Sequence, residues 1–130
     1  MKKYLPIILS LCLLGGCGGN SQTAKNGYKQ ISMEEAVTMM ENESGYIILD
    51  VRRADEYAEK HIPGAVNIPN ESIGTEDIPQ LPDKDQLILV YCRSGNRSKQ
   101  ASEKLAALGY TNIVEFGGII DWKGDTVSEK

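Results

Sequence analysis

Cys92 stands in a context that favours nucleophilic chemistry. It follows an aliphatic run and opens the segment CRSGNRS. Gly95 permits backbone angles closed to other residues, so this loop can turn its amide N–H groups inward. With a helix N-terminus behind the loop and two arginines in it, the conditions favour a thiolate over a thiol. A buried structural cysteine is the alternative, but it would need none of these features.

The same segment supplies the residues expected to bind an anionic substrate. These are the six residues after the nucleophile: Arg93, Ser94, Gly95, Asn96, Arg97 and Ser98. Either arginine alone could be a solvated surface charge. Their joint placement around one thiol favours anion binding.

The elements that position Cys92 follow from hydrophobic patterning. Expected strands cover residues 46–51, 65–68, 86–91 and 113–116, and expected helices cover residues 33–41, 54–59 and 98–108. Ser32 begins a capping box, and Gly109 suits the position just after a helix. Strands that alternate with helices predict a parallel α/β sheet, in one domain spanning residues 28–130. Cys92 then lies at the carboxyl end of a strand, where such folds bind ligands.

The first seventeen residues are typical of an export signal. Lys2 and Lys3 precede an apolar stretch at 5–14, which is shorter than the roughly 20 residues that span a membrane. Leu14-Gly15-Gly16-Cys17 resembles the bacterial lipobox, which predicts a signal peptide over 1–16 and lipidation of Cys17. Residues 17–27 are small and polar, as in a flexible tether. An uncleaved anchor and an ordinary cleavage site are the alternatives.

This interpretation places the domain outside the cytoplasm, anchored to a bacterial membrane by lipid. Cys12 would leave with the signal and Cys17 would carry the lipid, so Cys92 would be the one free thiol. The formal charge is −4, and removing residues 1–16, which hold two lysines and no acidic residue, makes it −6. This acidic balance argues against nucleic-acid binding. An anionic substrate would have to be attracted by a local cluster of positive charges.

Four motifs together resemble the single-domain rhodanese-like sulfurtransferases. Besides the loop after Cys92, they are LDVR followed by EY at 49–57, HIPGAVNIP at 61–69, and Gly117-Gly118 followed by Trp122. The resemblance implies a five-stranded parallel sheet flanked by helices on both faces. It also implies a persulfide at Cys92, surrounded by the backbone N–H groups of residues 93–97. Thr126 departs from the family, which usually has proline there.

The reaction implied by that resemblance moves a sulfane sulfur. The Cys92 thiolate would take it from thiosulfate or a persulfide, a protein persulfide included, and pass it to cyanide or a thiol. No metal or organic cofactor is required. Two alternatives stay open: a cysteine-dependent phosphatase or arsenate reductase, and a surface module that senses persulfides or redox state. The phosphatase pattern has five residues between cysteine and arginine, whereas four separate Cys92 from Arg97.

Other polar residues have structural interpretations. His61 is expected to shape the turn of its motif and not to act as a base. Asp50 and Arg52 could form an internal ion pair or contact substrate, and Glu56 could be a partner for Arg52. Trp122 is expected to be a core or lid aromatic beneath the Gly-Gly turn.

Overall fold

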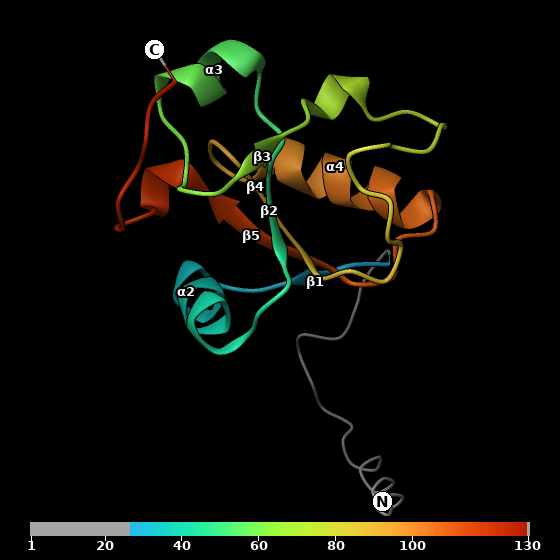
Figure 1. Cartoon of the computed structure of the whole chain (residues 1–130), viewed down its shortest axis with the longest axis horizontal. Coiled ribbons are helices and arrows are strands. Elements are labelled where there is room, and N and C mark those ends of the chain that lie inside the picture. The colour runs from blue at the N-terminus through green and yellow to red at the C-terminus, as the bar shows by residue number, and fades with distance from the viewer. Residues whose placement is uncertain (1–26, 130) are drawn as a thin grey trace, which may run out of the picture.

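Five parallel strands form the central sheet of the computed structural model, which describes residues 27–129 (Figure 1). Their order is β1-β5-β4-β2-β3. The strands are β1 Lys29–Gln30, β2 Ile47–Asp50, β3 Val66–Asn67, β4 Ile88–Cys92 and β5 Ile113–Gly118. This is the parallel α/β sheet that the sequence predicts. The predicted signal peptide and the lipidation at Cys17 lie outside the described residues, as does nearly all of the tether.

Helices cover both faces of this sheet. Alternate side chains of β4 face opposite ways: Leu89 and Tyr91 pack with α2 (Met33–Asn42), whereas Val90 and Cys92 pack with α4 (Asn96–Ala107). All five residues of β4 are buried, which explains why its sequence is continuously apolar. The sulfur of Cys92 therefore lies on the α4 side of the sheet.

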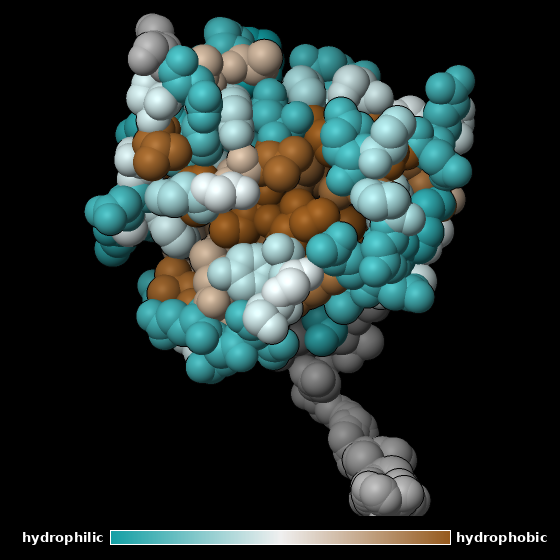
Figure 2. Space-filling model, in the orientation of Figure 1, coloured by the Kyte–Doolittle hydropathy of each residue, from teal (hydrophilic) through white to brown (hydrophobic). Residues whose placement is uncertain are grey.

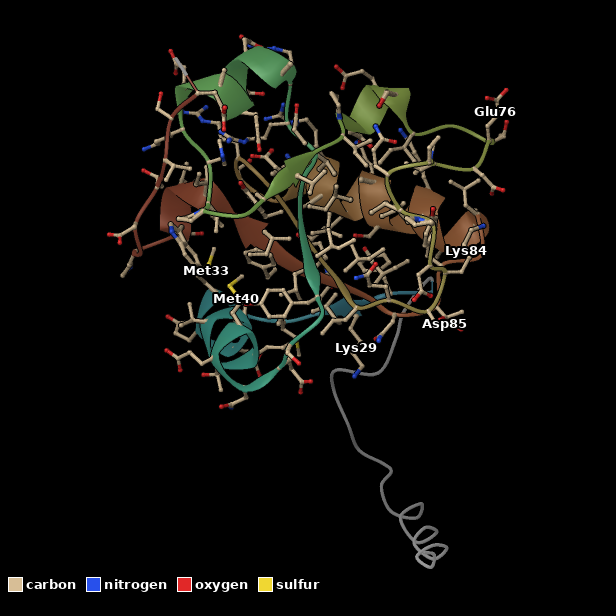
Figure 3. All side chains as sticks on the ribbon, viewed as in Figure 1. Lys29, Met33, Met40, Glu76, Lys84 and Asp85 are labelled. Atoms are coloured by element: carbon tan, nitrogen blue, oxygen red, sulfur yellow. The ribbon has the colours of Figure 1, made fainter. Side chains whose placement is uncertain are left out.

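The N-terminus of α2 forms as its sequence predicts. The Ser32 Oγ accepts the Glu35 N–H at 3.1 Å, and the Glu35 carboxylate accepts the Ser32 N–H at 2.9 Å. Met33 and Met40 lie on the side of α2 that faces the sheet (Figure 3) and pack against its buried residues. The capping box and the apolar face thus fix α2 on the face opposite Cys92.

The helix behind the Cys92 loop begins earlier than predicted. It starts at Asn96 instead of Ser98, because Gly95 takes a left-handed φ of 111° and ends the loop there. Arg97 therefore belongs to the first helical turn. At the other end, the Lys84 ammonium donates to the Leu108 carbonyl at 2.8 Å, where a cation suits the helix dipole.

Two elements at the edges of the sheet complete the fold. The sequence analysis did not predict β1, whose two residues pair with Val114 and Glu115 of β5. The opposite edge is β3, and Val66 in it is partly exposed. Seen in the orientation of Figure 1, the surface has an apolar area in its middle, around β2 and β3, and hydrophilic residues surround this area (Figure 2).

The direction in which successive strands are added to the sheet reverses between β2 and β4, although the strands themselves are parallel. From β2 the chain runs through α3 (Ala54–Glu59) to the edge strand β3, and from β4 it runs through α4 to β5 on the other side. Ligands of open α/β sheets bind at such a switch point, beyond the carboxyl ends of the strands. The topology thus places Cys92 where a binding site is expected.

Candidate active site

The sulfur of Cys92 lies beneath a short, sharply turned loop. Cys92 is 1% exposed, and three residues separate it from the first residue of α4. The Gly95 N–H donates to Sγ at 3.0 Å. Gly95 is also the N-cap of α4, so the sulfur lies at the positive end of that helix. Within residues 27–129, Gly95 supplies the one backbone N–H that bonds to this sulfur; the resemblance implied several.

Gly117 and Gly118 end β5, and Gly118 packs directly against the backbone of the Cys92 loop. A Cβ on Gly118 would overlap the Arg93 carbonyl group, so a side chain at that position would displace the loop. The Arg93 carbonyl accepts the Ile120 N–H at 3.2 Å, just beyond β5. The close approach of these two segments explains why glycine occupies position 118, the last residue of β5.

Arg97 is held in an ion pair that sequence spacing did not indicate. Its guanidinium donates to both oxygens of Glu56, at 2.7 and 3.2 Å. The hydrogen bond from Arg97 lowers the pKa of the Glu56 carboxyl, and the Glu56 side chain raises the pKa of Arg97. A thiolate at Cys92 would contribute to the raised pKa of Arg97, after Glu56. Arg97 thus joins the Cys92 loop to α3, with its guanidinium bound by both carboxylate oxygens of Glu56.

The prediction that Glu56 pairs with Arg52 is therefore wrong. Arg52 instead binds Asp50 through Nε and Nη2, with contacts of 2.7 to 3.1 Å, and both side chains are buried. The Tyr91 hydroxyl donates to the same carboxylate at 2.7 Å, and burial, followed by Asp50, raises the pKa of that hydroxyl. Asp50 and Arg52 form the internal ion pair that the sequence suggested, which fixes the chain after β2.

The remaining loop residues differ in their exposure. Arg93, Ser94 and Asn96 are exposed, whereas Ser98 is buried. Arg93 borders a cavity of about 260 Å³ at the switch point. Its lining residues are Arg52, Glu56, Glu59, Lys60, Arg93, Ile119 and Ile120. Of the six predicted binding residues, Arg93 therefore lies at the mouth of a cavity, while Gly95 and Ser98 contact the sulfur directly.

One buried acid beside the site was missed by the sequence analysis. Glu115 lies within β5, is 2% exposed, and accepts hydrogen bonds from the Ser98 hydroxyl and the Gly117 N–H. Ser98 in turn lies 3.4 Å from the Cys92 sulfur. A glutamate inside the apolar run IVEF, two residues after a core isoleucine, was the available signal, because that spacing puts it on the same face of the strand.

His61 and Trp122 each make contacts of a structural kind. The His61 ring stacks on Tyr57 at 3.7 Å, its Nδ1 lies 2.8 Å from the Tyr57 carbonyl, and its backbone pairs with Val127. Trp122 packs against the core on the α2 side and donates to the Asp125 carbonyl at 2.9 Å. Neither side chain bonds to Cys92.

Comparison with known proteins identifies this arrangement of sheet, loop and helix. Residues 32–125 match the model of the rhodanese-like domain. The chain belongs to the rhodanese-like family. The match begins at the cap of α2 and ends in the segment after Trp122, so it includes the Cys92 loop and the switch point.

Within residues 27–129, no helix is long and apolar enough to cross a membrane, and no group of three or more metal-binding side chains lies close enough together to hold a metal ion.

Relatives of known name lie within this rhodanese-like family. The thiosulfate sulfurtransferase PspE of Escherichia coli is 38% identical over 73 residues, covering 56% of this chain and 70% of PspE. The thiosulfate sulfurtransferase GlpE of Pseudomonas entomophila is 33% identical over 97 residues, covering 74% of this chain and 85% of GlpE. A solved rhodanese with anions from E. coli is 37% identical with a TM-score of 0.58, covering 64% of this chain and 98% of that structure. Both curated relatives are named as sulfurtransferases.

Proposed function

We propose that this protein is a sulfurtransferase that carries sulfane sulfur on Cys92, from a small anionic donor to a thiol or cyanide. The observation that carries the proposal is the position of the sulfur, which accepts the Gly95 N–H at 3.0 Å at the start of α4. Both groups favour negative charge on sulfur. The names of PspE and GlpE make thiosulfate the first donor to test.

The reaction is a double displacement. The Cys92 thiolate attacks the outer sulfur of thiosulfate, so a new S–S bond forms as the donor S–S bond breaks and sulfite leaves with its electron pair. Cys92 then holds a persulfide anion. Cyanide attacks the terminal sulfur, forms thiocyanate and restores the thiolate. A thiolate acceptor would do the same and leave as a persulfide.

The loop favours transfer of sulfur over transfer of phosphate. A phosphatase loop needs an open arginine and enough amides to surround a tetrahedral anion. Here the loop is one residue shorter than the phosphatase pattern, and Arg97 is bound by both oxygens of Glu56. Phosphatase or arsenate reductase activity is therefore not expected. Hydrolysis of p-nitrophenyl phosphate, without any sulfur transfer, would overturn this choice.

Intact-mass spectrometry of the full chain tests the central step. After exposure to thiosulfate, the protein should gain the mass of one sulfur atom and lose it again on addition of cyanide. The matched control is Cys92→Ser, which keeps the size of the side chain and the other two cysteines but should gain nothing. An unmodified wild type would refute the sulfurtransferase proposal. Loading by a persulfide without turnover to any acceptor would favour the sensing module.

We also propose that the protein is exported and anchored by lipid at Cys17. The support is the sequence of residues 1–17, in which a short apolar stretch precedes a cysteine after two glycines. In bacterial cells, a fatty-acid label should enter the wild type and not Cys17→Ser. The wild type and Cys17→Ser should both still gain one sulfur atom on exposure to thiosulfate, because Cys17 takes no part in the transfer. Label in both variants, or in neither, would argue against the anchor.

A further inference from the structure

Glu115 is a buried acid that the transfer described above does not use. Its carboxylate lies between the end of β5 and the first turn of α4, where it contacts Gly117 and Ser98. Its hydrogen-bond partners within residues 27–129 are neutral: the Ser98 hydroxyl at 2.5 Å and the Gly117 N–H at 2.9 Å. A buried carboxylate without a cation is costly, so a specific reason for its presence is expected.

Ser98 connects this carboxylate to the reacting sulfur. A hydroxyl has one proton to donate, and its shortest contact here is with Glu115 Oε2. The other acceptors, the carbonyls of Gly95 and Gly117, lie at 3.0 and 3.4 Å. A Ser98 hydroxyl that donates to Glu115 has lone pairs free to accept from the Cys92 S–H, whose sulfur is 3.4 Å away. The three groups form a continuous hydrogen-bonded chain.

This chain can also run in the opposite direction. With the proton on Glu115 Oε2, the carboxyl donates to the Ser98 oxygen and the Ser98 hydroxyl donates to a thiolate at Cys92. Each member is then still satisfied, and the site again holds one negative charge. Two charges so close together inside the protein would repel each other strongly, so one shared proton is the favoured state.

We propose that Glu115 holds the proton of Cys92 throughout sulfur transfer, and exchanges it through Ser98. This inference rests on the proposed function. On ionisation, the S–H bond of Cys92 breaks as Ser98 takes that proton and passes its own to Glu115. Thiolate and persulfide each carry one negative charge, so Glu115 stays protonated through loading and unloading. Glu115 acts through Ser98 and is a positioning residue.

The other titratable groups near Cys92 and Glu115 are not placed to hold the proton of Cys92. From α4, Arg97 faces Cys92 but is bound to Glu56 of α3. Just before β1, Tyr28 lies near Glu115, and burial, Glu103 and Glu115 all raise the pKa of the Tyr28 hydroxyl. Tyr28 is therefore neutral over the pH range of interest. No cation among these groups contacts Glu115 to stabilise a second negative charge.

Infrared spectroscopy of the unloaded full-length protein tests the proposal without requiring sulfur transfer. At a pH where ultraviolet absorbance reports a thiolate at Cys92, the wild type should show the band of a protonated carboxyl group. Glu115→Gln should lack this band. Cys92→Ser should lack it too, because Glu115 would then be the only anion of the site. A band of equal strength in Cys92→Ser would overturn the proposal, and so would a thiolate without any band in the wild type.

The pH profile of sulfur loading gives a second readout. In the wild type the proton stays inside the protein, so the loading rate should vary little between the two titration steps of the pair. In Glu115→Gln the proton must leave to solvent, so the rate should rise about tenfold per pH unit below the thiolate midpoint. Glu103→Gln, the same change at an exposed site on α4, should keep the wild-type profile. Identical profiles for Glu115→Gln and wild type would contradict the inference.

A pair of serine variants tests the connecting residue. Ser98→Ala should slow loading at least about tenfold, because proton transfer by a positioned group is worth that much or more. Ser102→Ala is the matched control, since Ser102 is equally buried one turn later and its hydroxyl has no hydrogen-bond partner in the described part of the chain, residues 27–129. Equal loading by the two variants would exclude Ser98 as the connection. Failure of the wild type to load would refute the proposed function and leave the infrared test of Glu115 in place.

Discussion

Replacing Gly95 by alanine should separate the chemistry of the Cys92 loop from its stability. Gly95 has a φ of 111°, a region that costs other residues roughly 1–2 kcal/mol. A Cβ at this position would meet Gly117 Cα at 3.7 Å, which is an ordinary contact. The variant should therefore fold, with its free energy of unfolding lowered by about 1–2 kcal/mol through backbone strain alone.

Its effect on sulfur loading should be larger than this strain explains. If the backbone relaxes, the Gly95 N–H leaves the sulfur, and a hydrogen bond to a charged group contributes about 1.5–3 kcal/mol. At about 1.4 kcal/mol per factor of ten, loading should slow by about 10- to 100-fold. Mass spectrometry would measure the loading rate, and urea unfolding would measure stability.

Gly64→Ala is the matched control for this substitution. Gly64 has a φ of 84°, and a Cβ there would meet nothing within 4 Å. It should lose a similar amount of stability and load sulfur at the wild-type rate. Equal loading by the two variants, at equal loss of stability, would refute the role of the Gly95 N–H in stabilising the sulfur anion.

Three further predictions concern the elements that hold the site. Asp50→Asn should lower the free energy of unfolding by about 3–5 kcal/mol in urea, because it leaves Arg52 buried and unpaired; a loss below about 1 kcal/mol would contradict the buried pair. The pKa of Glu56 is lowered by folding, so the stability from its pair with Arg97 is present above the unfolded pKa and lost as pH falls through the folded one. Acid unfolding of Glu56→Gln should lack this contribution, whereas a profile identical to wild type would show that the pair adds nothing. Ser32→Ala should cost about 1 kcal/mol of thermal or urea stability without changing sulfur loading, and reduced loading would mean that α2 affects the site.

The sequence predicted the parts of the site that depend on local pattern. A continuous aliphatic run predicted β4, and the position of Cys92 after it predicted a sulfur at the end of a buried strand. Both hold in the structure, because a parallel strand covered on two faces has a distinctive composition. The start of α4 was predicted two residues too late. Its first residues, Asn96 and Arg97, are polar and so show no apolar periodicity that would mark the helix.

Contacts between distant segments could not be predicted in the same way. Arg97 and Glu56 are 41 residues apart, and nothing in either local sequence selects one as the partner of the other. The strand β1 has two exposed residues, Lys29 and Gln30, and exists because β5 offers it an edge. Glu115 needed the register of β5 against α4 before its contact with Ser98 became visible. These features depend on tertiary packing more than on propensity.

The short outer strands of the sheet have a consequence for association between copies of this domain. An edge strand invites another copy of the chain to pair with it in proportion to the unpaired backbone groups it offers. Here β1 and β3 have two residues each, and Lys29 adds a charge to one of them. A second molecule would find too few hydrogen bonds at either edge to extend the sheet. Copies of the domain are therefore not expected to associate by extending the sheet at either edge.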